Sequence, residues 1–240
     1  MSTQIKSKKR VADHGEVYTN AREVKAMCDL VKDECERIES RFLEPACGNG
    51  NFLAEILARK LAVVTAKYAK NASDWEKYSF VAVSSLYGVE LLFDNTEECR
   101  KRLFEQWDTE YAKICKSACT DEMRNAIRFI LSRNILCGNA LSLMQVDDKA
   151  QDTKEPIIFS EWAFVDSNDH LKRRDFRLDL MLKCSEETDK QKASQQPSLF
   201  MTYEGMEYDR AKKAWIPKPI CEYAPVNYKC VAEQGECRHD

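Results

Sequence analysis

The stretch Phe42-Leu43-Glu44-Pro45-Ala46-Cys47-Gly48-Asn49-Gly50-Asn51-Phe52-Leu53 decides the fold that we expect. Apolar residues lead into an acidic residue, a Gly-x-Gly turn follows, and Asn51 opens a segment with helical periodicity. This order is typical of a strand that ends in a tight loop and continues into a helix. Gly48 and Gly50 let backbone approach a ligand where a Cβ would collide. The free N–H groups at the helix start suit an anionic or carboxylate-bearing group. An ordinary strand-turn-helix corner without a ligand is the plainer interpretation of a lone Gly-x-Gly pair.

Two further apolar stretches also end in polar residues. Residues 86–91 end near Glu90, and residues 134–141 contain Gly138-Asn139. Segments with helical periodicity lie between the three predicted strands, at residues 51–70, 75–85, 94–118 and 121–132, and another covers 21–40. The sequence therefore predicts an α/β fold in which a mostly parallel sheet is flanked by helices. The three strand ends should meet at the edge where open α/β sheets bind nucleotides.

The loop is specific enough to point to a family. Its pattern Glu-Pro-Ala-Cys-Gly-x-Gly-x-Phe resembles the S-adenosylmethionine loop of amino-methylating DNA methyltransferases, in particular the N6-adenine enzymes of restriction–modification systems with the gamma-type motif order. Upstream, Gly15-Glu16-Val17-Tyr18-Thr19 is similar to the family element Gly-x-aromatic-Thr-Pro, with Asn20 in place of the proline. In the family this element closes over the methionine end of the cofactor. The resemblance implies a cofactor contact for Tyr18, and a core aromatic is the alternative.

The other two strand ends match later elements of the same family. Tyr-Gly-Val-Glu-Leu at 87–91 matches the acidic strand end that accepts hydrogen bonds from the ribose hydroxyls, although a solvated glutamate is the alternative. Gly-Asn-Ala-Leu at 138–141 matches the element whose polar side chain binds the adenine amino group. The resemblance thus implies a Rossmann-like fold that binds S-adenosylmethionine. The implied cofactor residues are Tyr18, Thr19, Glu44, Pro45, Ala46, Cys47, Gly48, Asn49, Gly50, Asn51, Phe52, Glu90, Leu91, Asn139, Ala140 and Leu141.

The catalytic element of the family is missing. That element, Asn/Asp-Pro-Pro-Tyr/Phe, accepts the hydrogens of the adenine amino group and stacks on a flipped base. Beyond Asn139 the chain has no Asn-Pro or Asp-Pro dipeptide. Asn168-Asp169-His170 and residues 225–228 lack the adjacent prolines. We therefore expect no catalytic residue in this chain, and a partner chain that carries the motif.

Composition limits the partners that the chain can hold alone. With 240 residues, 44% apolar and 32% charged, it is typical of a soluble globular protein. Its formal net charge of −3 gives no basic surplus for duplex DNA, so DNA contact should be local or shared with a partner. No apolar run approaches the roughly 20 residues of a membrane span, and residues 1–10 lack a secretory core. Eleven scattered cysteines favour a reduced, cytoplasmic protein over a disulfide framework.

Three regions are expected along the chain. Residues 1–13 form a basic arm, either solvated or in contact with phosphate, and residues 14–150 form the cofactor-binding domain. In the extension 151–240 we predict a hairpin over 156–176, a helix over 177–183, a polar linker over 185–198 and an aromatic, proline-rich tail from Phe200. Lys172-Arg173-Arg174 is interpreted as a solvated turn, with phosphate contact as the alternative. The spacing of Cys221, Cys230, Cys237 and His239 matches no zinc knuckle, so no metal site is predicted.

Two functions follow from these patterns. In the first, the chain is the S-adenosylmethionine-binding subunit of an adenine-specific N6 DNA methyltransferase of a restriction–modification system. A partner chain then supplies the Asn-Pro-Pro-Tyr motif and DNA recognition, and the isolated chain is inactive. In the second, it is a non-catalytic or degenerate module of the methyltransferase fold, with a role in assembly or regulation.

Overall fold

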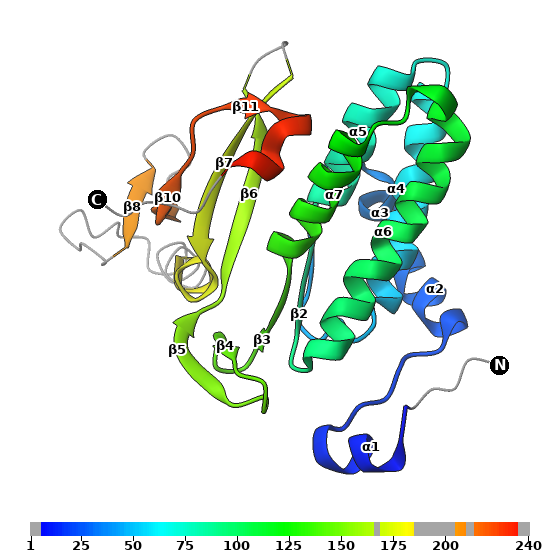
Figure 1. Ribbon diagram of the computed structural model, residues 1–240. Coiled ribbons are helices and arrows are strands. Elements are labelled where there is room, and N and C mark those ends of the chain that lie inside the picture. Colours follow the sequence, from blue (N-terminus) through cyan, green and yellow to red (C-terminus); the bar gives the residue numbers. More distant parts are fainter. Residues whose placement is uncertain (1–5, 166–168, 185–204, 210–213, 235–240) are drawn as a thin grey trace.

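The computed structural model describes residues 6–165, 169–184, 205–209 and 214–234 (Figure 1). The helices are α1 (Lys8–His14), α2 (Ala21–Leu30), α3 (Lys32–Glu36), α4 (Asn51–Tyr68), α5 (Ala72–Ser84), α6 (Phe93–Cys115) and α7 (Asp121–Asn134), with 3-10 turns η1 (Lys116–Ala118) and η2 (Tyr228–Glu233). The strands are β1 (Phe42–Glu44), β2 (Leu86–Glu90), β3 (Ile135–Asn139), β4 (Met144–Val146), β5 (Asp152–Pro156), β6 (Ile158–Phe164), β7 (His170–Arg177), β8 (Met206–Asp209), β9 (Ala214–Pro217), β10 (Cys221–Glu222) and β11 (Val226–Asn227). The chain is a mixed α/β protein.

The first sheet has the order β1-β2-β3-β4-β5. β1, β2 and β3 are parallel, as predicted, whereas β4 and β5 are antiparallel and make the sheet mixed. The antiparallel part arises because β3 turns back directly into β4, and the N–H of Leu143 donates to the carbonyl of Asn139 at 2.8 Å. Helices α4 to α7 lie on one side of the parallel strands, and β6 and β7 lie on the other (Figure 1). Right-handed crossovers that add strands in one direction place their helices on one face.

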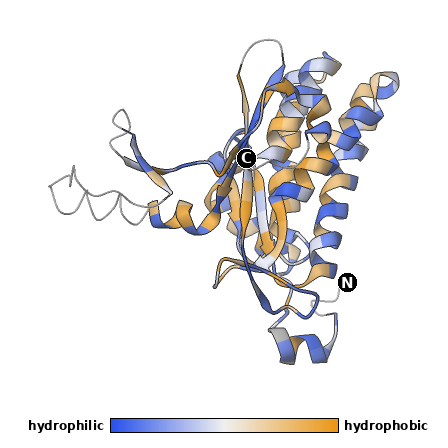
Figure 2. Ribbon diagram, turned by 60° about the vertical axis from the view of Figure 1, so that its left-hand side comes forward, coloured by the Kyte–Doolittle hydropathy of each residue, from blue (hydrophilic) through white to orange (hydrophobic). Residues whose placement is uncertain are grey.

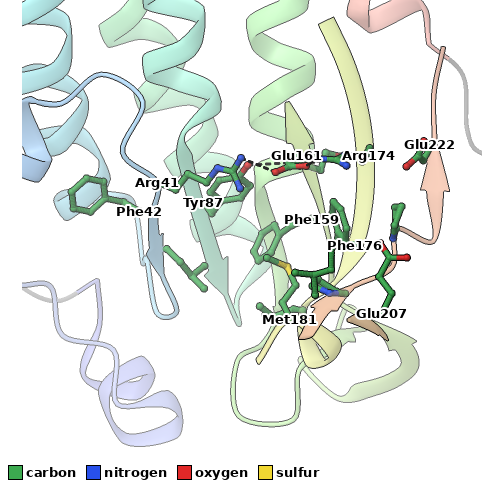
Figure 3. A pocket seen from close by; sticks show the side chains of 16 residues that line it. Arg41, Phe42, Tyr87, Phe159, Glu161, Arg174, Phe176, Met181, Glu207 and Glu222 are labelled. Atoms are coloured by element: carbon green, nitrogen blue, oxygen red, sulfur yellow. Dashed lines mark hydrogen bonds and ion pairs between the residues drawn. The ribbon is translucent and has the colours of Figure 1, made fainter. Parts of the chain in front are cut away.

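β2 is buried on both faces and separates two apolar clusters. Leu86 belongs to the main core with the helices, in which Trp75, Trp107 and Tyr111 stack. Tyr87 belongs to a second cluster and meets Phe159 of β6 edge to face, with ring centroids 5.2 Å apart (Figure 3). Side chains alternate across a strand, so a continuously apolar β2 fits a layer covered on both sides. Apolar residues concentrate on these central strands, and hydrophilic residues on the outer helix faces (Figure 2).

The predicted helices form, and α4 to α7 begin and end within three residues of the predicted bounds. The helix expected over residues 21–40 divides at Val31 into α2 and α3, and the side chain of Asn20 caps α2. The sequence predicts Asp94 or Asn95 as the N-cap of the helix over 94–118, but α6 begins at Phe93 and no side chain caps it. None of the helices in the described ranges combines the length and the apolar content that a membrane crossing requires.

The C-terminal extension packs on its own chain. The predicted hairpin forms from β6 and β7, and residues 178–184 are helical, one position from the prediction. β10 and β11 from the tail add to β7, while β8 pairs with β9. The predicted linker over residues 185–198 lies outside the described residues. Cys221 at the start of β10 is disulfide-bonded, which differs from the reduced state expected for the cysteines.

The basic run Lys172-Arg173-Arg174 is part of a strand and does not form the predicted solvated turn. It lies inside β7, where each residue has an acidic partner on its own chain. Lys172 pairs with Glu222 at 2.7 Å, Arg174 pairs with Glu161, and Arg173 is buried against Asp175 at 2.7 Å. The prediction was wrong because β-strand alternation sends the middle residue inward, and a run of three charges hides that alternation.

Candidate functional site

The carboxyl ends of the three parallel strands meet at one edge of the sheet. Glu44 stands in register with Gly88, and Glu90 with Cys137 of β3. The loop after β1 is tied to β2 at this edge, because the N–H of Cys47 donates to the carbonyl of Val89 at 3.0 Å. The structure thus places the Gly-x-Gly loop beside the acidic end of β2.

Both loop glycines have positive φ angles, +53° at Gly48 and +86° at Gly50. A Cβ on Gly50 would lie 2.7 Å from the sulfur of Cys99 in α6, which would force a rearrangement. Gly50 is also the N-cap residue of α4, and no side chain caps that helix. The first-turn N–H groups therefore carry no side-chain acceptor, which is the condition for binding an anionic group there.

Glu90 holds the loop with its carboxylate. Oε2 accepts from the N–H of Gly48 at 2.9 Å, and Oε1 accepts from the N–H of Leu92 at 3.0 Å and from Nδ2 of Asn95 at 3.3 Å. The side chain is buried. A carboxylate has about four lone-pair positions, so these three bonds leave one, on Oε2, for a further donor.

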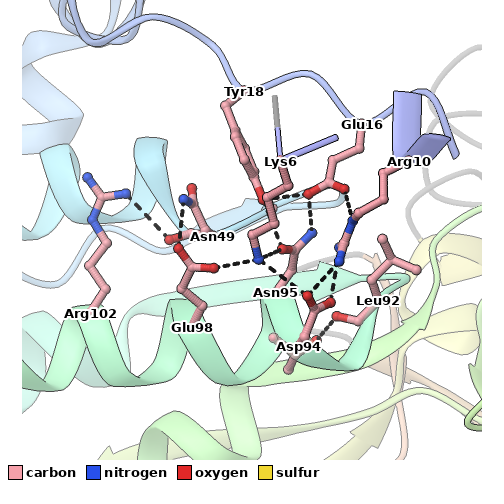
Figure 4. Close-up of polar contacts among 12 residues, drawn as sticks. Lys6, Arg10, Glu16, Tyr18, Asn49, Leu92, Asp94, Asn95, Glu98 and Arg102 are labelled. Carbon is pink, nitrogen blue, oxygen red and sulfur yellow. Dashed lines mark hydrogen bonds and ion pairs between the residues drawn. The ribbon is translucent and has the colours of Figure 1, made fainter. Parts of the chain in front are cut away.

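Tyr18 lies over the loop and reaches the same network (Figure 4). Its ring is the nearest neighbour of Gly48, where a Cβ would meet ring carbon Cε1 at 3.3 Å. Its hydroxyl donates to Glu16 at 2.5 Å and contacts Oδ1 of Asn95 at 2.9 Å. Nδ2 of Asn95, a fully buried residue, donates to both Glu16 and Glu90. Asn95 therefore connects the upstream element to the end of β2.

Two cations of the basic arm, Lys6 and Arg10, are paired with α6, whereas Lys8 and Lys9 are exposed. Lys6 Nζ lies 2.6 Å from Glu98 and 3.3 Å from Asp94, and the Arg10 guanidinium lies 2.6 Å from Asp94 (Figure 4). The hydrogen bond from Arg10 lowers the pKa of Asp94 to about 2. The arm is drawn to α6 because the first two turns of that helix present carboxylates, which stabilise a helix N-terminus.

The arm and the loop together carry an acidic excess. Four carboxylates face three cations within the connected network, because Arg102 contacts the carbonyl of Asn49; its charged members are Glu16, Glu90, Asp94, Glu98, Lys6, Arg10 and Arg102. With all these groups ionised, the network has a formal charge of −1. Such a site favours a ligand that brings positive charge.

The β3 end is occupied by its own neighbours. Nδ2 of Asn139 donates to Asp152 of β5 at 2.9 Å, and its Oδ1 accepts from the N–H of Leu141 at 3.0 Å. The side chain of Leu141 is 96% exposed, while Ala140 packs against the second apolar cluster. Asn139 forms no hydrogen bond with Tyr18 or Glu90, all three of which lie in the described ranges.

The remaining predicted residues hold the loop in shape. Ala46 donates its N–H to Oε1 of Glu44 at 3.4 Å, and burial raises the pKa of Glu44. Asn51 Nδ2 donates to the carbonyl of Thr19 at 3.2 Å and so ties the upstream element to α4. Oδ1 of Asn49 is buried with no hydrogen-bond partner, although its Nδ2 donates to Glu98. The loop therefore keeps one buried acceptor without a donor, close to the open start of α4.

Sequence reasoning missed the residues that join these parts. Asn95 was interpreted as a helix cap, and Glu16 was only a variable position of its motif. The signal that would have found them is the acidic first turn of α6 beside a basic arm. No group of histidine, cysteine or acidic side chains in the described ranges could hold a metal ion. No family model, curated protein or solved structure matches the chain.

Proposed function

We propose that the chain is the S-adenosylmethionine-binding subunit of an adenine-specific N6 DNA methyltransferase of a restriction–modification system, with a Rossmann-like cofactor half. One observation carries the proposal: Glu90 at the end of β2 contacts the N–H of Gly48 in a Gly-x-Gly loop that opens an uncapped helix. The loop, the acidic strand end and the upstream Tyr18 element follow one another in the order of that family.

The residues present fit the cofactor in charge and in hydrogen bonding. S-adenosylmethionine supplies an electrophilic methyl group on a sulfonium. Its sulfonium and ammonium groups suit the acidic excess of the site, and its carboxylate suits the first-turn N–H groups of α4. Asn49 Oδ1 offers an acceptor that no protein group uses. Glu90 would bind ribose through its remaining acceptor position, or by giving up the bond from Asn95.

A partner chain is part of the proposal because this chain lacks an acceptor-positioning group. The amino group of adenine is a weak nucleophile, and the family uses an Asn-Pro-Pro-aromatic motif to accept its hydrogens. That motif is missing, and the net charge of −3 offers little attraction to a phosphate backbone. DNA binding and base positioning are therefore assigned to the partner.

One observation favours the second function, a degenerate module. Glu90 is already bonded to three internal donors, and both polar atoms of Asn139 have partners on the chain. A strand edge whose polar groups bond to one another can serve as a rigid core for assembly or regulation without binding a cofactor.

Titration calorimetry of the full chain with S-adenosylmethionine separates the two functions. Binding, with competition by S-adenosylhomocysteine, is the expected result, and no detectable heat would leave only the degenerate module. Methyl transfer to DNA is then assayed with the chain alone and with the product of the neighbouring reading frame. We expect activity only in the mixture. Robust activity of the single chain would refute the proposal that a partner chain supplies the catalytic motif.

A further inference from the structure

α1 is held to the rest of the chain by charge. It stands apart from helices α4 to α7 (Figure 1), and none of the apolar side chains described between Lys6 and Asn20 is buried. Val17, for example, is 58% exposed. A helix of seven residues is not stable on its own, because nucleation costs more than so few hydrogen bonds return. The position of α1 therefore depends on its polar contacts.

Arg10 of α1 makes the central contact. Its Nη1 and Nη2 donate to the two oxygens of Asp94 in α6, at 2.6 and 3.0 Å, and its Nε donates to Oε2 of Glu16. A guanidinium is planar and keeps its charge, so it can hold two carboxylates at once in a fixed geometry. Arg10 thus fixes Glu16 relative to the start of α6 (Figure 4).

Glu16 in turn constrains Tyr18. Its other oxygen, Oε1, accepts from the Tyr18 hydroxyl at 2.5 Å and from Nδ2 of Asn95 at 3.1 Å. The ring of Tyr18 lies against Gly48. A chain of contacts therefore runs from α6 through α1 and Glu16 to the Gly-x-Gly loop.

Glu16 needs the charge of Arg10 to keep this position. Its side chain is 8% exposed, and among the described residues Arg10 is the only cation within ion-pair distance of it. The end of β2 brings a second buried carboxylate, Glu90, to the same network through Asn95. Without the guanidinium, Glu16 would be a buried charge without compensation, which is costly. Glu16 would then turn to solvent and draw Tyr18 away from the loop.

We propose that Asp94, Arg10 and Glu16 form an ionic latch that holds Tyr18 closed over the Gly-x-Gly loop and that frees residues 6–20 when it breaks. The latch can open, because the side chains of Arg10 and Asp94 are 26% and 54% exposed and salt screens such a pair. Arg10 is thus a positioning residue, which acts on a ligand through Tyr18. That ligand is S-adenosylmethionine, and this step rests on the proposed function. Arg10 and Asp94 lie outside the sequence elements that resemble the methyltransferase family.

The test uses the full chain and two measurements of the closed state. Hydrogen exchange followed by mass spectrometry reports whether α1 is folded, and hydroxyl-radical footprinting reports how far the ring of Tyr18 is exposed. Arg10→Gln and Asp94→Asn break the latch from either side. Glu97→Gln is the matched control, because it removes a half-exposed carboxylate from the same part of α6, where its partner is Arg100 of that helix.

Both latch variants should speed exchange in α1 and oxidation of Tyr18 by about fivefold, whereas Glu97→Gln should match wild type. Raising NaCl from about 0.05 to about 0.5 M should have the same effect on wild type and a smaller one on Arg10→Gln. Arg10→Lys, which keeps the charge, should fall between wild type and Arg10→Gln. Faster exchange in α1 without faster oxidation of Tyr18 would overturn the inference, because α1 would then fray alone. No change in either measurement would also overturn it.

Retention of the cofactor is the third measurement. Tritiated S-adenosylmethionine should dissociate from Arg10→Gln about fivefold faster than from wild type or Glu97→Gln, because Tyr18 covers the loop for less of the time. Equal dissociation rates would overturn the role of the latch in retention. A chain that binds no S-adenosylmethionine in calorimetry overturns the proposed function alone, since exchange and footprinting test the latch without the cofactor.

Discussion

The carboxylate of Glu90 accepts a hydrogen bond of 2.9 Å from the backbone N–H of Gly48. This bond joins the end of β2 to the loop that follows β1, across 42 residues of sequence. The same carboxylate holds Leu92 and Asn95, so Glu90 fixes both the loop and the start of α6. Glu90 can therefore affect a ligand of the loop in two ways. It fixes the backbone of the loop, and its carboxylate also faces the loop.

Replacing Glu90 should weaken cofactor binding. Glu90→Ala removes the acceptor for Gly48 and for ribose, and we expect a loss of about 1.5–3 kcal/mol in affinity for S-adenosylmethionine by calorimetry. Glu97→Ala is the control. Glu97 lies near the start of α6, its side chain is half exposed, and it pairs with Arg100. Thermal unfolding of both variants separates loss of fold from loss of affinity. An affinity equal to wild type would mean that Glu90 has a structural role alone.

Gly50→Ala should destabilise the chain more than Gly15→Ala. Both glycines have positive φ, so both substitutions carry the conformational cost of about 1–2 kcal/mol. A Cβ at Gly15 meets nothing within 4 Å, whereas at Gly50 it meets Cys99 at 2.7 Å. The difference between the two variants in urea denaturation therefore measures the contact of the loop with α6. Equal losses would mean that the loop moves away from Cys99 at no cost.

The parallel strands, the helices and the Gly-x-Gly loop within residues 14–139 could be predicted because their signals are local. The Gly-x-Gly turn, the helical periodicity of α4 to α7 and the apolar run of β2 each depend on a few neighbouring residues. The pairing of Lys6 and Arg10 with α6 could not be predicted, because it joins residues more than 80 positions apart. A run of basic residues in the sequence does not identify the acidic residues with which it pairs in the fold.

The antiparallel part of the first sheet was missed for a similar reason. Nothing in Gly138-Asn139 distinguishes a turn into a helix from a turn into β4, and Asn139 finds its partner Asp152 only once the hairpin forms. A Cβ on Gly138 would meet Ile157 at 2.8 Å, so tertiary packing alone requires a glycine here. Gly138 can thus match the family motif while tertiary packing also requires it.

Buried Lys60 should make stability depend on pH. Its ammonium donates to the carbonyls of Ile38 and Ser40 just before β1 and to the hydroxyl of Ser85, and burial lowers its pKa from 10.5 to about 7. Between these pH values the unfolded chain holds a proton that the folded chain has released. The contribution of Lys60 to the free energy of unfolding therefore rises with pH across this window, by up to about 1.4 kcal/mol per unit.

The measurement compares wild type with Lys60→Met by denaturant unfolding at several pH values from 7 upward. The unfolding free energy of wild type minus that of Lys60→Met should increase as pH rises, because methionine does not titrate. Lys101→Met, at an exposed position of α6, should leave a difference that is flat with pH. A flat difference for Lys60→Met as well would show that the amine keeps its proton in the folded chain.

Breaking the ion pair inside β7 should destabilise the sheet formed by β6, β7, β10 and β11. Arg173 and Asp175 are 2% and 4% exposed, and their side chains form two hydrogen bonds, at 2.9 and 2.7 Å. Asp175→Asn leaves the guanidinium buried without a counter-charge, and we expect a loss of about 3–5 kcal/mol in denaturant unfolding. The double variant Arg173→Met with Asp175→Leu removes both charges, so it should be more stable than the single variant. A single-variant loss below about 1 kcal/mol would mean that water or Ser160 compensates Arg173, and that β7 tolerates the isolated charge.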